Sequence, residues 1–381
     1  MKTWLAKQRV KASVMKVFRN GGIGIHYSYS SNSGIVYPSI LCIRFNYSGM
    51  SLDVVFSLPT GMDPKEVLKK EYCFKQVFGE RIDLKGDHKH FTLTVYTADS
   101  IKLLPYSFEK FEPFLKGSIP IICGKSSTGK TVAYDMVSHP HLLIAGETGS
   151  GKSTQLRSIL TGLIQNLPSE RLHLYLCDLK RSEFHVFRNI KHVQGVYVSP
   201  ADILPMLLYL QEETRNRGDL LDSYEVAHID DLPDPPPYII LCIDEVALLK
   251  KQKALLEVLE EISSIGRALG VFLILSMQRP DSKLLEGALK NNMTVRMGFK
   301  CADRINSKII GTPGSEKLKG DGIMLLKLQG QEKLKEIQAP YLSIEEAKSI
   351  LAPYKSPTNQ KSFKQPEKDS EIIDAIFEVL D

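Results

Sequence analysis

The stretch HLLIAGETGSGKSTQLRSILTGLI, from His141 to Ile164, decides how the rest of the chain is interpreted. It begins with a short apolar run, Leu142 to Ala145, that predicts a buried strand. It ends with leucines and isoleucines at helical spacing. Between these parts lies the pattern G-x-x-x-x-G-K-S, from Gly146 to Ser153. A strand, a glycine-rich turn and a helix form the context in which this pattern binds phosphate.

Each residue type in this turn has a physical task in holding a nucleotide. Glycine permits a positive φ and leaves room for a phosphate beside the backbone, and the first N–H groups of a helix attract an anion. We expect Lys152 to reach the β- and γ-phosphates of ATP and Ser153 to bind Mg²⁺. The predicted nucleotide-binding residues are Gly146, Glu147, Thr148, Gly149, Ser150, Gly151, Lys152, Ser153 and Thr154.

A second match to the same pattern, GKSSTGKT, runs from Gly124 to Thr131. The segment after it, TVAYDMVSHP, alternates like a strand and reaches Pro140 before a helix can develop. We therefore predict a hairpin turn at this second match and assign nucleotide binding to the downstream loop.

Two acids follow the apolar run Tyr238 to Ile243 in the segment YIILCIDEVALL. Carboxylates at the end of a buried strand carry a desolvation cost that solvated turn acids avoid. With a phosphate loop upstream, we expect Asp244 to hold Mg²⁺, together with Ser153, and Glu245 to polarise the attacking water as general base. The chain has no N-K-x-D guanine-reading motif, which favours ATP over GTP.

Polar residues also follow two further apolar strands. Asp178 and Lys180 come after the strand Leu172 to Leu176, at the end where open α/β sheets bind ligands, although a surface turn would show the same residues. Gln278 follows the strand Val271 to Ser276 and is a candidate sensor of the γ-phosphate, with a plain turn residue as the alternative.

Two arginines further along the chain are candidates for an arginine finger. Arg296 lies in a predicted strand, Thr294 to Phe299, and Arg304 lies in the helix that follows. Such a residue stabilises transition-state charge in the site of a neighbouring subunit. Ordinary surface or interface ion pairs explain either arginine equally well.

Composition sets bounds on the remaining interpretation. The chain has 381 residues, of which 43% are hydrophobic, and a net charge of +5, so two or three domains and a polyanionic partner are compatible with it. Six scattered cysteines without a C-x-x-C pair predict free thiols rather than a metal site. No apolar run approaches the roughly 20 residues that span a bilayer, and the basic N-terminus lacks the core of a signal peptide.

The pattern along the chain predicts three regions. Residues 1–117 read as a basic amphipathic helix and a small β-rich α+β module, with a helix from Pro64 to Phe78 that Asp63 caps. The helix packs on its own domain or binds an anionic surface. Residues 118–354 carry the α/β motifs, and residues 355–381 read as a flexible linker and a short acidic helix.

Several segments, taken in order, resemble the motor of the FtsK/SpoIIIE family of hexameric DNA translocases, across roughly Ser118 to Ile344. They are HPHLLIAGETGSGKST, CDLKRSEF, YIILCIDEVALL, IGRALGVFLILSMQRPDSKLLEGALKNNMTVRMGF and GSEKLKGDGIML. The resemblance implies a RecA-like P-loop ATPase, with a mostly parallel sheet between helices, that forms a ring around DNA and moves it. It also favours Arg296 over Arg304 as the finger and equates the N-terminal module with the small domain that precedes the family's motor.

Chromosome-segregating members of the family carry membrane spans and a winged-helix domain, and this sequence shows neither. The compact form resembles members from plasmids and integrative conjugative elements, where they act as coupling proteins or DNA pumps. We therefore expect a cytoplasmic homo-hexamer, recruited to the inner face of the membrane by an anchored partner, that transfers a mobile element. A relaxase and a replication protein are further candidate partners.

DNA would be gripped through its phosphates without sequence reading. The candidate residues, each equally typical of plain surface, are Lys283, Lys290, Lys317 and Lys319. Three alternatives remain: a protein-translocating ATPase of the type VII secretion kind, a chromosome-partitioning DNA pump, and an assembly factor that binds ATP with little turnover. The complete set of Lys152, Asp244 and Glu245 argues against the last.

Overall fold

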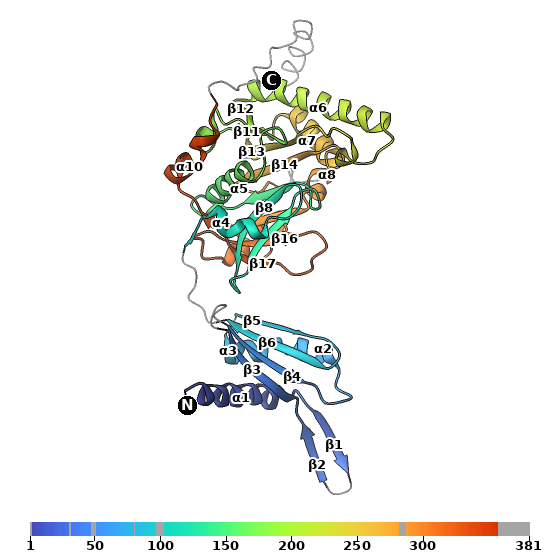
Figure 1. Ribbon diagram of the computed structural model, residues 1–381, viewed down its shortest axis with the longest axis vertical. Helices are drawn as coiled ribbons and strands as arrows, with labels where there is room; N and C mark the ends of the chain where they lie inside the picture. Colours follow the sequence, from blue (N-terminus) through green and yellow to red (C-terminus); the bar gives the residue numbers. More distant parts are fainter. Residues whose placement is uncertain are drawn as a thin grey trace. The chain divides into compact units, whose positions relative to one another are not determined.

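The structure is a computed structural model that describes residues 2–29, 32–46, 51–79, 81–96, 103–281 and 287–356. Its contacts divide the chain into two compact units (Figure 1): Met1–Lys102 with Ser127–Lys130, and Leu103–Ser126 with Thr131–Asp381. Each unit is described by itself. The predicted C-terminal acidic helix lies outside the described residues, as does most of the predicted linker before it.

The smaller unit is a four-stranded antiparallel sheet with helices packed on it, and its strand order is β3-β4-β6-β5. The predicted strands are present, but the single helix expected from Pro64 to Phe78 is two helices that meet at Lys70. Asp63 caps the first of them, as predicted, by accepting from the Lys65 N–H. The elements are α1 Lys2–Asn20, β1 Ile25–Tyr29, β2 Asn32–Val36, β3 Ser39–Asn46, β4 Ser51–Ser57, α2 Pro64–Lys69, α3 Glu71–Phe78, β5 Ile82–Gly86 and β6 His90–Tyr96.

Helix α1 packs on its own unit through its second half. Val14, Val17 and Phe18 are buried, and the Phe18 ring contacts rings from β4 and α3. Trp4 and Leu5, in the first turn of the same helix, are 62% and 50% exposed. The helix therefore buries only part of the face that the sequence predicts.

The larger unit is built on a ten-stranded sheet of order β12-β11-β13-β14-β10-β15-β16-β17-β8-β9. The first six strands run parallel, and the last four add on in antiparallel pairs. The predicted mostly parallel α/β sheet is thus confirmed for the part that carries the motifs. The strands are β7 Leu104–Pro105, β8 Pro120–Ser126, β9 Thr131–Asp135, β10 Leu142–Ala145, β11 Leu172–Asp178, β12 Val193–Tyr197, β13 Tyr238–Asp244, β14 Val271–Met277, β15 Val295–Phe299, β16 Ile323–Leu328, β17 Lys335–Gln338 and β18 Pro340–Tyr341.

Helices cover both faces of this sheet. The buried side chains of β10 alternate: Leu142 and Ile144 pack with α5 on one face, and Leu143 and Ala145 pack with α6 and α7 on the other. Figure 1 shows α5 and α10 on one side of the strands and α6, α7 and α8 on the opposite side. The helices are α4 Phe108–Phe111, α5 Lys152–Asn166, α6 Pro200–Ser223, α7 Lys253–Ile265, α8 Gly287–Asn292, α9 Arg304–Ile310 and α10 Ile344–Leu351.

The structure groups residues 103–117 with the larger unit, whereas the sequence pattern placed them with the smaller one. The physical reason is a short parallel pairing of β7 with β18, far along the chain. Tyr106 extends this pairing through its N–H to the Tyr341 carbonyl, at 2.9 Å, and through its hydroxyl to Gln165 on α5, at 2.8 Å. Local sequence carries no signal for a partner this distant.

The upstream pattern match, Gly124 to Thr131, is a turn between antiparallel strands β8 and β9, as predicted. All six cysteines are free thiols, and five of them are buried. No helix in the described parts of the chain is both long enough and apolar enough to cross a membrane.

His141 is a buried titratable residue at the entrance to β10. It is 1% exposed, adopts a left-handed φ of 59°, and its Nδ1 accepts from the Leu273 N–H of β14 at 3.0 Å. Burial lowers the pKa of His141 from 6.5 to about 4. Because the folded pKa is depressed, the unfolded chain takes up the proton first as the pH falls.

We predict that the larger unit loses stability between pH 6.5 and pH 4, by about 2 kcal/mol at pH 5 from this histidine alone. His141→Asn should flatten this dependence, since asparagine tolerates the left-handed backbone and accepts the same N–H without titrating. Hydrogen exchange of β10 and β14 amides across this pH range measures the effect. His88→Asn, at an exposed position, is the control, and equal pH dependence in the His141 variant and the wild type would contradict the assignment.

Candidate functional site

The site lies where three neighbouring parallel strands end. Strands β13, β14 and β10 are adjacent in the sheet, so their carboxyl ends meet at one edge. The glycine-rich loop leaves β10 directly after Ala145, and Ser276 on β14 lies opposite Ile144. On the other side of β13, Asp178 at the end of β11 lies opposite Asp244. Strand register alone therefore gathers the polar residues that the sequence singled out.

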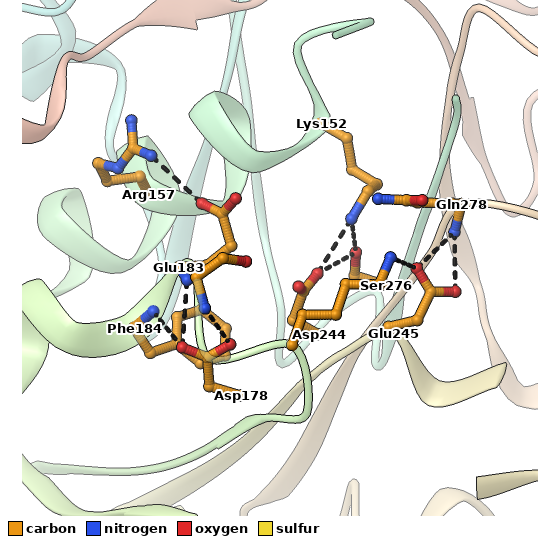
Figure 2. A network of polar contacts seen from close by, with 11 residues as sticks. Lys152, Arg157, Asp178, Glu183, Phe184, Asp244, Glu245, Ser276 and Gln278 are labelled. Carbon is orange, nitrogen blue, oxygen red and sulfur yellow. Dashed lines mark hydrogen bonds and ion pairs between the residues drawn. The ribbon is translucent and has the colours of Figure 1, made fainter. Parts of the chain in front are cut away.

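Lys152 is held at this edge by two partners (Figure 2). Its Nζ lies 3.0 Å from Asp244 Oδ1 and 2.7 Å from Ser276 Oγ, and the Ser276 hydroxyl donates to Asp244 Oδ1 at 3.1 Å. All three side chains are buried, with Lys152 only 4% exposed. A buried ammonium and a buried carboxylate require each other, because an unpaired buried charge is costly.

Glu245, the next residue, is directed to different partners. Its Oε2 lies 2.6 Å from Lys180 Nζ, and the Gln278 N–H lies 3.1 Å from Oε1 and 3.2 Å from Oε2. Its backbone is left-handed, with φ 63° and ψ 57°, which costs a non-glycine residue about 1–3 kcal/mol. The two adjacent acids thus form ion pairs with different lysines: Asp244 with Lys152, and Glu245 with Lys180.

The glycine-rich loop has the geometry that a phosphate needs. Gly149 and Gly151 have φ of 79° and 107°, and the space beside Gly149 is open. The Ser150 hydroxyl is buried and has no hydrogen-bond partner among the described residues. Open space, an unpaired buried hydroxyl and the first N–H groups of α5 fit a polyphosphate.

The donor set also fits Mg²⁺ in the company of phosphate. Ser153 is half-buried at the second position of α5, and Asp244 ends β13 on the same sheet edge. Across the described ranges, no group of three or more His, Cys, Asp or Glu side chains is placed to hold a metal by itself. This is the usual situation for Mg²⁺ at nucleotide sites, where one or two protein oxygens add to phosphate oxygens and water.

Asp178 anchors the turn that carries Lys180. Its carboxylate accepts the N–H groups of Ser182, Glu183 and Phe184 at 2.9–3.1 Å, and it is 2% exposed. Glu183 in turn lies 3.2 Å from the guanidinium of Arg157, on the phosphate-loop helix. Asp178 thus stabilises the turn of residues 178–184, and Glu183 connects this turn to α5.

Arg296 is engaged within its own chain. Its Nε donates to the Met293 carbonyl at 3.2 Å, and its terminal nitrogens donate to Ile310 at 3.1 Å and Lys290 at 2.7 Å. The side chain is half-buried, and burial lowers the pKa of Arg296. By contrast, Arg304 is exposed at the first position of α9. The finger role that the family resemblance favoured for Arg296 stays a prediction.

Two contacts at the site were missed by sequence reasoning. Ser276 ends the apolar run VFLILS, and a hydroxyl inside such a run was the available signal. Gly322 lies so close to the phosphate loop that a Cβ on Gly151 would come within 2.6 Å of its Cα, and its N–H donates to the Ser150 carbonyl at 3.1 Å. Nothing local in the sequence pairs two glycines this far apart.

The candidate DNA-contacting lysines are distributed over separate elements. Lys317 and Lys319 are exposed in the segment before β16, Lys290 is half-buried on α8, and Lys283 lies outside the described residues. Gln278 follows β14, next to Glu245, as Figure 2 shows.

We predict that Arg296→Ala destabilises the larger unit by about 2–4 kcal/mol, because three carbonyls lose a charged donor. Arg304→Ala, at an exposed position, should change stability by less than about 0.5 kcal/mol. Thermal unfolding of the two variants measures the difference. An Arg296→Ala protein as stable as the wild type would show that its three hydrogen bonds contribute nothing.

Comparison with known proteins adds to this geometry. The family model described as "FtsK/SpoIIIE family" matches residues 115–234, which include the phosphate loop and the Asp178 turn. The DNA translocase FtsK of Helicobacter pylori is 32% identical over 249 residues, which cover 62% of this chain and 30% of that protein. The DNA translocase FtsK of Leptospira interrogans is 33% identical over 248 residues, 61% of this chain and 26% of that protein. The chain thus spans about 30% of the length of these relatives.

Solved structures share the fold at lower identity. The monomer form of the pCW3 conjugation coupling protein TcpA, solved with ATPγS, is 23% identical, with a TM-score of 0.60 over 90% of this chain and 99% of that one. ATPases 2 and 3 of EssC from Geobacillus thermodenitrificans are 18% identical, with a TM-score of 0.61 over 71% of this chain and 55% of that one. The fold is therefore that of the P-loop ATPases.

The segment that matches the family model includes Lys152 and Asp178 and ends at residue 234, before Asp244, Glu245 and Ser276. The chain is thus similar to the FtsK/SpoIIIE family over residues 115–234, and its larger unit has the fold of the P-loop ATPases.

Proposed function

We propose that this protein is an ATP-dependent DNA translocase. The observation that carries the proposal is the convergence of Lys152, Asp244, Ser276 and Glu245 at one sheet edge, beside a loop that fits a polyphosphate. A phosphate-binding lysine, a buried acid next to it and a second acid one residue further are the parts that ATP hydrolysis requires.

In the proposed reaction, the loop N–H groups and Lys152 bind the phosphates of ATP, and Lys152 exchanges part of its contact with Asp244 for phosphate oxygens. Ser153 and Asp244 would hold Mg²⁺, which, when bound, offsets the charge of the phosphate oxygens. Glu245 accepts the proton of the water that attacks the γ-phosphorus, and ADP leaves. Gln278, whose N–H contacts Glu245, would respond to the γ-phosphate.

The sequence relatives support DNA as the cargo. The relatives that are 32% and 33% identical are named DNA translocases. The secretion ATPase EccC from Thermomonospora curvata is 22% identical and shares the fold. A homo-hexameric ring around DNA would need an arginine that reaches the neighbouring site, and the exposed Arg304 is available for it. The exposed Lys317 and Lys319 would contact phosphates without reading sequence.

A role in conjugative transfer is the finer proposal. It is supported by the likeness to the coupling protein TcpA, which extends over nearly the whole of both chains and so includes the smaller unit. In that role the smaller unit would be available for a relaxase, a replication protein or an anchored partner at the membrane.

The first test is the ATPase rate without DNA, with long duplex DNA and with long single-stranded DNA. We expect one DNA form to stimulate the rate several-fold, and Lys152→Ala and Glu245→Gln to lower the rate about 100-fold or more in all conditions, because they remove a phosphate contact and the general base. Lys130→Ala is the matched control, since Lys130 occupies the same place in the hairpin match GKSSTGKT, and its rates should equal those of the wild type.

Two outcomes would count against the proposal. A rate that needs Lys152 but ignores both DNA forms would replace DNA with a protein cargo, of the kind that type VII secretion ATPases move. Equal loss of activity in the Lys130 and Lys152 variants would mean that the wrong loop was assigned.

We also predict that Lys317→Ala with Lys319→Ala weakens DNA binding and reduces the slope of log K against log salt by about 1 for each phosphate that is no longer neutralised. Fluorescence anisotropy with labelled DNA across a salt series measures this slope. Lys251→Ala with Lys253→Ala, another exposed pair at the start of α7, is the control. An unchanged slope in the Lys317 and Lys319 variant would exclude these residues from the DNA interface.

A further inference from the structure

Lys180 is in direct contact with the proposed general base, yet the proposed function gives it no task. Its Nζ lies 2.6 Å from Glu245 Oε2, within the range of a strong charge-assisted hydrogen bond. The carboxylate is 6% exposed and the lysine side chain is 30% exposed, so this pair lies at the border between the buried edge of the sheet and solvent.

The contact limits how Glu245 can accept a proton. Each carboxylate oxygen offers two lone pairs. Oε2 already accepts from Lys180 and from the Gln278 N–H, while Oε1 accepts from the Gln278 N–H alone. A water that approaches Glu245 therefore finds one of the two oxygens fully used, and that oxygen also faces an ammonium charge.

The surroundings of Lys180 make this contact reversible. The backbone on both sides of Lys180 is fixed, since Asp178 accepts three N–H groups from residues 182–184 and also accepts Arg181 N–H through its carbonyl. Glu183 is tied to Arg157 on α5. The ammonium itself stands on a flexible, partly exposed stem, so it can leave Glu245 without disturbing the turn that carries it.

We propose that Lys180 is a positioning residue that restrains Glu245 when no DNA is bound, and that release of this ion pair accompanies the DNA-stimulated state. The inference rests on the proposed function. Lys152, by contrast, pairs with Asp244 and Ser276 rather than with Glu245. The restraint is thus specific to the base and separate from the phosphate contact.

The test compares steady-state ATP hydrolysis of the full chain and of Lys180→Met, with and without the stimulating DNA. We expect kcat without DNA to rise about tenfold, which corresponds to about 1.4 kcal/mol of restraint removed by the substitution. The DNA-stimulated kcat should stay within about twofold of the wild type, and KM for ATP should not change. The ratio of stimulated to basal rate should therefore fall.

Three companion variants make the result specific. Lys180→Arg keeps the charge and should keep the low basal rate. Lys180→Met combined with Glu245→Gln should be inactive, because the raised rate must pass through Glu245. Lys250→Met removes another lysine of an acid pair, 3.9 Å from Asp281, and should leave the basal rate unchanged.

A basal rate in Lys180→Met that is equal to or below that of the wild type would overturn the inference, since Lys180 would then be a structural or supporting partner. That result leaves the proposed function intact as long as Lys152→Ala abolishes hydrolysis. Hydrolysis that is absent from the wild type, or insensitive to Lys152→Ala, would instead refute the proposed function itself.

Discussion

The contact of Lys152 with Asp244 and Ser276 is the constraint on which the site depends. It joins the ends of three parallel strands, β10, β13 and β14. The three side chains can meet only if these strands pair in the observed register. The desolvation of a buried ion pair is expensive, and the Ser276 hydroxyl reduces that cost by bonding to both partners. The pair holds Lys152 in place beside the glycine-rich loop.

Three of the acids around this contact each pair with a different cation. Asp244 pairs with Lys152, Glu245 pairs with Lys180, and Glu183 pairs with Arg157. Adjacent carboxylates would otherwise repel each other at a buried edge. Because Lys180 and Glu183 belong to one anchored turn, this turn connects helix α5, through Arg157, with Glu245. The ion pairs Arg157–Glu183 and Lys180–Glu245 therefore link a displacement of α5 to the position of the Glu245 carboxylate.

Much of this arrangement could be predicted from the sequence, for identifiable reasons. Apolar runs that end in polar residues marked β10, β11, β13 and β14, and parallel strands place such ends on one edge. The proline after TVAYDMVSH separated the true phosphate loop from the hairpin at Gly124 to Thr131. Side-chain contacts and pairings between distant segments could not be predicted. The finger role favoured for Arg296 stays a prediction, and its contacts with the carbonyls of Lys290, Met293 and Ile310 had no signal in the sequence. Residues 103–117 belong to the larger unit because β7 pairs with β18. The helix expected from Pro64 to Phe78 is interrupted at Lys70, where the sequence has no proline or glycine to predict a break.

In the proposed function, ATP hydrolysis at this site moves the protein along DNA. The most direct measurement is displacement of a block from the track: a third strand bound to duplex DNA, or streptavidin on biotinylated single-stranded DNA. We expect ATP to drive displacement from one of these tracks, a non-hydrolysable ATP analogue to cause none, and Lys152→Ala to abolish it. Rapid DNA-stimulated hydrolysis without displacement from either track would refute translocation, since the chain would then use ATP to bind DNA or to release it without movement.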